Sequence, residues 1–324
     1  MALRPRSDDT ASVRSPALAS LWLALLPLLV GSCAHGPPRF DPAVRRTCLV
    51  LSVGGPRGVA HLGAIAAVRK AGLKIDCVVG NSMGALVGAL YASAPGEDTE
   101  ARFRRFSEEY AAETKLDLAK NGAVGAAVGS ALGYLIGTVA GEENAKKIAV
   151  AGAVLGAGAG AALGMKQTAL LDRDRLVRVV DRLTGGARIE ALSLPYATTY
   201  QQRADDGLQL VIARTGNLAD AVGKSVANPF IFTNLDVVAQ GAVDPGADRA
   251  SMTPVDEACR LFPDANLLAI NVTGAPAFYR AEMKCPLREV RVDPGPLDAA
   301  SVFRLEADFT RAVKAGFDTT TKAL

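Results

Sequence analysis

The feature that most constrains the fold is a pattern of strand, glycine-rich turn and helix that occurs twice. The apolar, β-prone run 48–53 is followed by the glycine-rich turn 54–58 and by a helical pattern over 59–71. A second β-prone run, 75–79, meets another glycine-rich turn before a helical pattern over 85–92. Strands that alternate with helices in this way form parallel sheets with crossover helices. The pattern therefore predicts an α/β fold, with a central, mostly parallel sheet and helices on both of its faces.

The chain beyond residue 98 continues with helical and strand-like stretches. In a parallel sheet, ligands bind beside the carboxyl ends of the strands. Both glycine-rich turns fall at that edge, so we expect the functional site there. Helices are expected over 99–118, 171–184, 217–226, 254–261 and 302–322, and strands near 195–200, 208–213, 237–243 and 267–272.

The second glycine-rich turn, Gly80-Asn81-Ser82-Met83-Gly84, fits the G-x-S-x-G pattern of nucleophilic serines. A serine on a sharp turn between a strand and a helix needs very small neighbours, and Gly80 and Gly84 supply that room. The following helix points its free N–H groups and its dipole at the serine, which favours negative charge there. The pattern alone also fits a tight turn with an inert serine. Its place between a strand and a helix favours Ser82 as a nucleophile.

The first glycine-rich turn, Gly54-Gly55-Pro56-Arg57-Gly58, is a candidate oxyanion hole. Acyl transfer creates a tetrahedral oxyanion that backbone N–H groups stabilise, and the loss of one donor costs roughly 3–4 kcal/mol. Pro56 has no N–H, so the donors would come from Gly54, Gly55, Arg57 or Gly58. A phosphate or dinucleotide loop is the rival interpretation. The segment matches neither the Walker pattern nor G-x-G-x-x-G, because position 53 is valine.

Composition argues against several other kinds of site. The chain of 324 residues has two histidines, His35 and His61, and no Cys-x-x-Cys or His-Glu-x-x-His pattern. A metal site built on several histidines is therefore excluded. A net charge of +3, with dispersed basic and acidic residues, gives no nucleic-acid surface. We expect no metal, no cofactor and no nucleic-acid partner.

The five cysteines show no regular spacing. Because free cysteine prefers burial, Cys48, Cys77, Cys259 and Cys285 fit buried free thiols in the core. A Cys259–Cys285 disulfide is the alternative, in an oxidising compartment.

Both glycine-rich turns belong to a longer set of segments: 49–52, 57–64, 79–85, 216–225 with Pro229, 242–246, 253–258 and 270–274. Together these segments resemble bacterial patatin-like phospholipases. The resemblance implies a three-layer patatin-like fold and a Ser–Asp dyad, in which Ser82 is the nucleophile and Asp244 its base. Gly246 would belong to the aspartate motif, and His61 would lie on a helix without acting as the base. The family also implies hydrolysis of acyl esters in lipids or phospholipids, without a cofactor.

Four residues leave alternatives open. Val53 and Pro245 stand where the family has glycine. One alternative is therefore a catalytically impaired envelope lipoprotein that binds lipid or scaffolds a complex, and another is an acyltransferase. A second Val-Asp-Pro-Gly segment makes Asp293 a weaker candidate for the base, because it follows the last expected strand. Arg57 would either brace its loop or meet a lipid phosphate.

Residues 122–164 differ in kind from the rest of the chain. Glycine recurs there at every fourth residue in two runs, which places a glycine stripe on one face of each of two helices. Such stripes let helices approach closely, as in membrane proteins. The pattern resembles a glycine zipper and predicts a Gly-rich helical hairpin inserted in the hydrolase domain. The hairpin would enter a membrane, pack on the protein or a partner, or form a mobile lid.

The N-terminus has the layout of a secretory signal. Arginines precede an apolar run over 17–30, which is short for a membrane span of roughly 20 residues. The ending Leu29–Cys33 resembles a bacterial lipobox, and an uncleaved anchor with an incidental cysteine is the alternative. The expected organisation is a signal peptide at 1–32, a tether at 33–47 and a patatin-like hydrolase domain at 48–324.

The lipobox predicts a mature protein that begins at Cys33 and is acylated on the amine and thiol of that residue. Such a lipoprotein would be anchored in the bacterial cell envelope, in the outer membrane facing the periplasm. Mass spectrometry of the N-terminal peptide checks this prediction. A mature form that still carries Met1, or an unmodified Cys33, would contradict it.

Overall fold

The structure, a computed structural model, describes most of the expected hydrolase domain. The expected signal peptide 1–32, Cys33 and the glycine-zipper segment 122–164 lie outside the described residues. No helix in the described part is long and apolar enough to cross a membrane. The described residues belong to one compact unit and comprise 39–114, 173–205, 207–228, 241–280, 282–297, 302 and 304–324.

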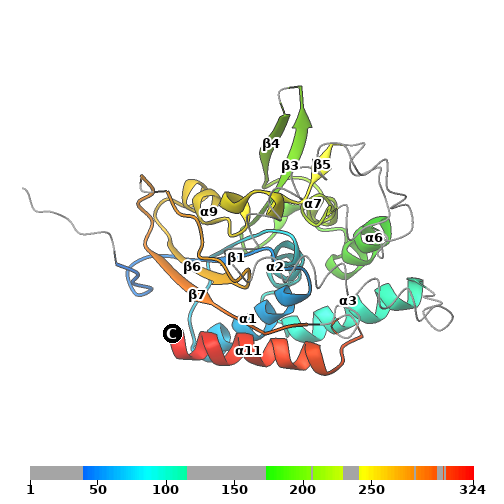
Figure 1. The fold of residues 1–324 in the computed structure, drawn as a ribbon, viewed down its shortest axis with the longest axis horizontal. Helices are drawn as coiled ribbons and strands as arrows, with labels where there is room; N and C mark the ends of the chain where they lie inside the picture. The colour runs from blue at the N-terminus through cyan, green and yellow to red at the C-terminus, as the bar shows by residue number, and fades with distance from the viewer. Residues whose placement is uncertain are drawn as a thin grey trace, which may run out of the picture. The chain divides into compact units, whose positions relative to one another are not determined.

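Seven strands of the described part form one sheet in the middle of the fold (Figure 1). Their order is β4-β3-β2-β1-β6-β7, and β5 pairs with β3 beside that path. β1 runs parallel to β2 and β6, β2 to β3, and β6 to β7, whereas β4 and β5 are antiparallel to β3. The expected mostly parallel sheet is therefore confirmed. The strands are β1 (Thr47–Leu51), β2 (Cys77–Gly80), β3 (Tyr196–Ala204), β4 (Gly207–Ala213), β5 (Ala242–Val243), β6 (Asn266–Asn271) and β7 (Leu287–Arg291).

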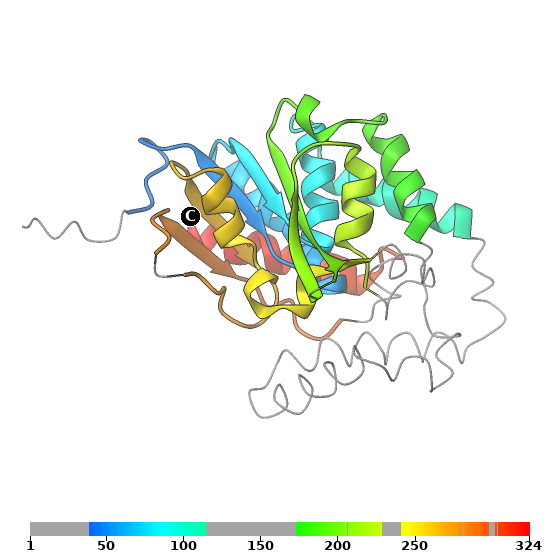
Figure 2. The same ribbon diagram turned by 90° about the horizontal axis from the view of Figure 1, so that it is seen from above.

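Helices cover the two faces of the sheet unequally. One face carries the larger hydrophobic core, to which six helices contribute, and α9 (Val255–Leu261) packs on the other face. In Figure 2, α9 in gold and α11 in red lie on opposite sides of the sheet. The expected three layers are present. The six helices are α1 (Ala60–Lys70), α2 (Met83–Ser93), α3 (Thr99–Thr114), α6 (Arg173–Thr184), α7 (Leu218–Ser225) and α11 (Ala307–Ala323).

The central strand β1 is buried on both faces. Leu49 and Leu51 point into the larger core, and Cys48 and Val50 belong to the core under α9. A strand covered on both sides needs apolar residues at every position, which explains the continuous apolar run in the sequence. The two glycine-rich turns leave the carboxyl ends of β1 and β2, which are neighbours in the sheet.

One strand and two disulfides differ from what the sequence predicts. The sequence pattern predicts no strand at β7, because Leu287–Arg291 is a charged edge strand in which Val290 is the buried residue. Four cysteines expected as free thiols are paired instead, as the disulfides Cys48–Cys77 and Cys259–Cys285. The first pair joins register partners on β1 and β2. The second is the alternative considered above, and its Cα atoms are 5.7 Å apart, within the usual range for a disulfide.

The contact between α1 and α11 depends on two glycines. A Cβ atom on Gly63 would overlap the Val313 carbonyl oxygen, and a Cβ atom on Gly316 would overlap the Ala60 carbonyl oxygen. The helix backbones therefore touch, and the C-terminal helix lies directly against the helix that follows the first glycine-rich turn.

Gly63→Ala and Gly316→Ala should each lower the free energy of unfolding by about 1–3 kcal/mol, because overpacking forces the two backbones apart. Urea unfolding followed by circular dichroism measures this change. Gly96→Ala is the matched control, since a Cβ atom there would meet nothing within 4 Å. Equal stability of all three variants would show that the close helix contact is not formed.

Candidate active site

Ser82 lies on a sharp turn between β2 and α2. Its backbone has φ 52° and ψ −121°, and with Leu305 it is one of two described non-glycine residues with positive φ. Such a conformation costs of order 1–3 kcal/mol and persists where the surroundings enforce it, often at functional sites. The Ser82 N–H donates a hydrogen bond to the Ser225 hydroxyl at 2.9 Å. The side chain thus lies at the N-terminus of α2, as the sequence predicted.

The turn needs glycine at both of the predicted positions. A Cβ atom on Gly80 would overlap the Gly84 carbonyl group. A Cβ atom on Gly84 would lie 2.5 Å from the Ser52 carbonyl oxygen and 2.6 Å from that of Leu51. The start of α2 therefore rests directly on the backbone at the end of β1.

Asp244 lies beside Ser82, although 161 residues separate them in the chain. The Ser82 hydroxyl donates a hydrogen bond to the Asp244 carboxylate. Both residues are buried, with 7% of Ser82 and 5% of Asp244 exposed. Burial raises the pKa of Asp244 to about 6, and the hydrogen bonds from Ser82 and from the Gly246 N–H oppose this rise. A buried carboxylate with a raised pKa is a stronger proton acceptor than an exposed one.

The Asp-Pro-Gly segment holds this carboxylate without the middle glycine typical of the family. Asp244 has φ −54° and ψ 128°, an extended conformation that a following proline favours. Its Oδ1 accepts a hydrogen bond from the Gly246 N–H at 2.7 Å. The backbone of β5 fixes the start of the segment, because it pairs with β3 at Gln201 and Gln202. Pro245 is therefore compatible with a well-supported aspartate.

The first glycine-rich turn forms a short 3-10 helix, Gly55–Val59, at the end of β1. Gly55 has φ +48°, which favours glycine, and a Cβ atom on Gly54 would overlap the Val272 side chain. The Arg57 N–H donates to the Gly54 carbonyl oxygen at 3.0 Å, so this predicted oxyanion donor is already engaged within the turn. A Cβ atom on Gly58 would overlap Met83, the residue after Ser82. The turn thus lies against the start of α2.

The Arg57 side chain braces this turn. Its Nε donates to the Val272 carbonyl oxygen at 2.8 Å, and its Nη2 donates to Asp293 Oδ1 at 2.8 Å. The guanidinium is buried, and both bonds hold it against the ends of β6 and β7. Of the two alternatives for Arg57, the structure shows the bracing contact. The Asp293 carboxylate bonds Arg57, whereas the Asp244 carboxylate bonds Ser82.

His61 is the one histidine in the described residues and does not contact the pair. It is fully buried on α1, where its Nε2 lies 3.0 Å from the Ser52 carbonyl oxygen. Burial lowers the pKa of His61 to about 4, so the ring is neutral at pH 7 and Nε2 donates to that carbonyl. The other histidine, His35, lies outside the described residues.

Asn81 is a buried support that sequence reasoning passed over. Its Nδ2 donates to the Ser251 carbonyl oxygen at 2.7 Å, and its Oδ1 accepts from the N–H and the hydroxyl of Thr199 at 3.1 and 2.9 Å. The amide therefore ties the turn to β3 and to the segment after Asp244. A polar residue next to Ser82, in a turn expected to be buried, is the signal that could have identified it.

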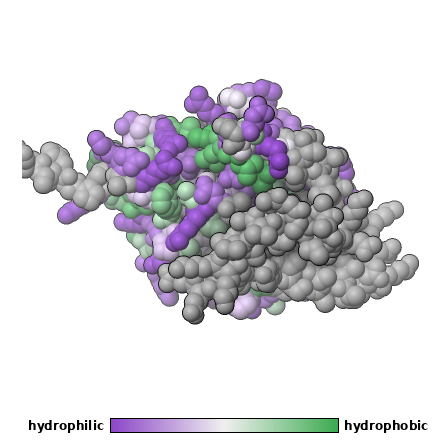
Figure 3. Space-filling model, turned by 45° about the horizontal axis from the view of Figure 1, so that its top comes forward, coloured by the Kyte–Doolittle hydropathy of each residue, from purple (hydrophilic) through white to green (hydrophobic). Residues whose placement is uncertain are grey.

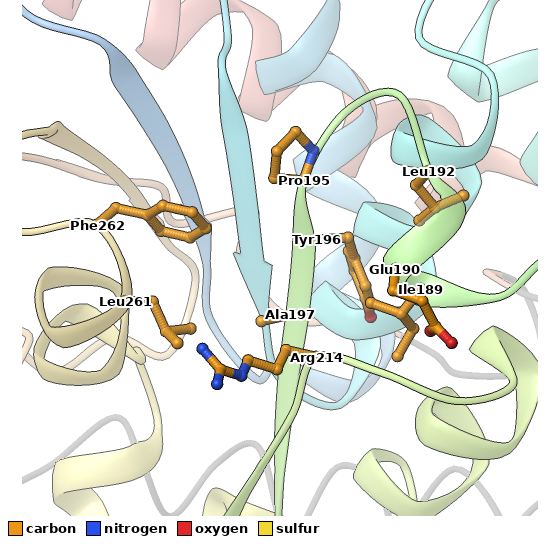
Figure 4. A pocket seen from close by; sticks show the side chains of 9 residues that line it. All are labelled: Ile189, Glu190, Leu192, Pro195, Tyr196, Ala197, Arg214, Leu261 and Phe262. Carbon is orange, nitrogen blue, oxygen red and sulfur yellow. The ribbon is translucent and has the colours of Figure 1, made fainter.

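A surface cavity of about 200 Å³ lies beside the first residues of β3 (Figure 4). Its lining includes Pro195, Tyr196 and Arg214 but neither Ser82, Asp244 nor the first glycine-rich turn. The cavity is therefore separate from the Ser82–Asp244 pair. No group of three or more His, Cys, Asp or Glu residues in the described part is placed to hold a metal ion.

Comparison with known proteins finds a family match over most of the described sheet and helices. The family model for patatin-like phospholipases matches residues 49–260, more than half of the chain, and the match includes Ser82 and Asp244. Lysophospholipase NTE1 of Mycosarcoma maydis is 42% identical over 94 residues, which are 27% of this chain and 5% of that protein. The same enzyme of Coccidioides immitis is 42% identical over 85 residues, 24% of this chain and 5% of that protein. The chain thus covers a small part of these relatives.

Two solved structures are similar at lower identity. VipD from Legionella pneumophila is 15% identical with a TM-score of 0.42, over 86% of this chain and 66% of that one. The ExoU–SpcU complex of Pseudomonas aeruginosa contains a chain that is 17% identical with a TM-score of 0.39, over 88% of this chain and 52% of that one. On the family match over 49–260, the chain belongs to the patatin-like phospholipase family.

Proposed function

We propose that the protein hydrolyses acyl esters in lipids or phospholipids, with Ser82 as nucleophile and Asp244 as its base. The observation that carries this proposal is the hydrogen bond from the Ser82 hydroxyl to the buried Asp244 carboxylate, at the N-terminus of α2. A nucleophile bonded to a base is the arrangement that activates a serine hydroxyl. Family membership supports the substrate class.

The first half of the reaction acylates the enzyme. Asp244 accepts the proton of the Ser82 hydroxyl while Oγ attacks the ester carbonyl carbon, and the carbonyl oxygen becomes an oxyanion. Backbone N–H groups of Gly54, Gly55 and Gly58 are the proposed donors to that oxyanion, together with the helix dipole of α2. Collapse of the tetrahedral intermediate breaks the ester bond, and the leaving alcohol takes the proton from Asp244.

The second half releases the acyl group. Asp244 accepts a proton from water as the water oxygen attacks the acyl carbonyl of Ser82. The second tetrahedral intermediate then collapses, the Ser82 oxygen regains the proton, and a carboxylic acid leaves. Asp244 acts as base and acid in both halves, which suits a carboxyl group whose pKa lies closer to neutrality than usual.

The hairpin of β3 and β4 supports a lipid substrate. β3 runs parallel to β2 and continues past Thr198, the register partner of Gly80, so the hairpin projects from the edge that carries Ser82. On β4, 50% of Leu208 and 36% of Leu210 are exposed. Figure 3 brings this end of the molecule forward and shows hydrophobic surface among hydrophilic side chains. An enzyme that acts on aggregated lipid needs such apolar contact beside its site.

Attachment to a membrane through an acylated Cys33 would keep this edge near its substrate. The proposal also gives the glycine-zipper segment 122–164 a role in attachment or assembly. Both rest on the sequence patterns described above, because these residues lie outside the described part of the structure.

Ser82→Ala and Asp244→Asn should each lower hydrolysis of a fluorescent acyl ester by roughly a thousandfold or more, and the double variant should be little worse. Residues that act as one unit lose their effect together, which makes the two changes strongly non-additive. Fluorophosphonate labelling, with the modified residue located by mass spectrometry, should identify Ser82.

Two comparison variants sharpen this test. Asp318→Asn removes an exposed carboxylate on α11 and should leave the rate unchanged. His61→Gln should lose far less activity than Ser82→Ala, because His61 contacts the Ser52 carbonyl and not the dyad. If folded His61→Gln proves as inactive as Ser82→Ala, the Ser–Asp mechanism is wrong.

The pH profile should follow the ionisation of Asp244. Below its pKa of about 6 the carboxyl is protonated and cannot accept the serine proton, so kcat/KM should rise with pH up to about 6 and then level off. His61, with a pKa of about 4, titrates well below this limb. Initial rates between pH 4 and 8 measure the profile, and the limb should persist in His61→Gln. A profile that is flat through pH 6 would remove Asp244 from the role of base.

A further inference from the structure

We propose that Asp293, in the second Val-Asp-Pro-Gly segment, is a positioning residue for the oxyanion loop, defined here as residues 53–58. Its carboxylate would fix Arg57, and through Arg57 it would hold the backbone donors of the loop beside Ser82. The inference rests on the proposed function, because it assigns a role within the same reaction.

The two Val-Asp-Pro-Gly segments fold in the same way locally. Asp244 Oδ1 accepts the Gly246 N–H at 2.7 Å, and Asp293 Oδ1 accepts the Gly295 N–H at 3.0 Å. In each case the aspartate bonds the backbone two residues further on, which fixes the direction of its carboxylate. One carboxylate meets the nucleophile, and the other meets Arg57 of the oxyanion loop.

Arg57 links the Asp293 carboxylate to the loop. Its guanidinium is buried, with 9% of the side chain exposed, and it bonds Asp293 and the Val272 carbonyl oxygen at 2.8 Å each. A planar guanidinium that bonds through two nitrogens has a fixed orientation, unlike a lysine ammonium. Both partners of Arg57 lie just beyond the carboxyl ends of strands, Val272 after β6 and Asp293 after β7.

The segment around Val272 also contacts Ser52, the residue before the loop, and Gly54 within it. The Val272 N–H donates to the Ser52 hydroxyl at 3.0 Å, and its side chain occupies the space that a Cβ atom on Gly54 would need. The Val292 N–H donates to the Asn271 carbonyl oxygen at 2.8 Å, which joins the ends of β6 and β7. The ends of β6 and β7 are thus held together, and Asp293 adds a negatively charged carboxylate that bonds Arg57 of the loop.

Loss of the Asp293 carboxylate leaves the Arg57 charge poorly compensated beside the loop. The guanidinium would then turn toward water and draw Gly54 and Gly55 away from their positions. Misplacement of a catalytic group by about 1 Å can cost roughly a hundredfold in rate. Because the oxyanion forms only during the reaction, the loss should appear in kcat and not in KM.

The test compares Asp293→Ala, Asp293→Asn and the control Asp318→Asn in the full-length protein. Asp293→Ala should lower kcat for a fluorescent acyl ester by about tenfold and change KM by less than about threefold. Asp293→Asn keeps the turn and an acceptor oxygen, so its kcat should lie between those of Asp293→Ala and the wild type. Hydrogen exchange of the amides in 54–58 should be faster in Asp293→Ala, with an unchanged thermal midpoint. Asp318→Asn should match the wild type in every measurement.

The outcomes separate this inference from the proposed function. If the wild type neither hydrolyses esters nor reacts with a fluorophosphonate at Ser82, the proposed function fails, and loop exchange alone decides the role of Asp293. Unchanged kcat in Asp293→Ala, or unchanged loop exchange, overturns the inference. Loss of kcat that is equal in Asp318→Asn, or that follows a lowered thermal midpoint, also overturns it.

Discussion

The close approach of the Gly84 backbone to the end of β1 is the constraint on which the site depends. Leu51 and Gly80 are register partners, and a Cβ atom on Gly84 would lie 2.5 Å from the Ser52 carbonyl oxygen. Ser82 therefore follows one strand, and the first glycine-rich turn follows its neighbour at nearly the same level. The hydrogen bonds between β1 and β2 set the distance between the two turns.

Around this contact, buried polar groups are joined to one another and to the backbone. Asn81 ties the turn at Ser82 to β3 and to Ser251, and Arg57 ties the first glycine-rich turn to Val272. A buried polar group without a partner costs roughly 1–3 kcal/mol, so such networks specify one arrangement. Asp244 differs from these groups, since burial raises its pKa and leaves it a ready proton acceptor. Asn81 and Arg57 thus hold the turns in place, whereas Asp244 is the group in this network that is suited to accept a proton.

The two Val-Asp-Pro-Gly segments show which features local sequence determines and which it does not. Both form the turn that the residues favour, with the carboxylate bonded to a glycine N–H. Their surroundings differ, because Asp244 is 5% exposed beside Ser82 and the Asp293 side chain is 79% exposed beside Arg57. The sequence favoured Asp244 through its resemblance to a family, whereas the turn chemistry of the two segments is the same.

The sequence by itself determined the parallel sheet, the sharp turn at Ser82 and the glycine-rich turn beside it, because these follow from short-range sterics and periodicity. Only the tertiary structure decided the partners of Arg57, the contacts of Asn81 and Ser225, the two disulfides and the edge strand β7. Most of these features join residues far apart in the chain, and β7 carries a charged sequence that only its neighbour β6 makes into a strand. Such pairings depend on which surfaces the packed sheet brings together, and no local pattern records that.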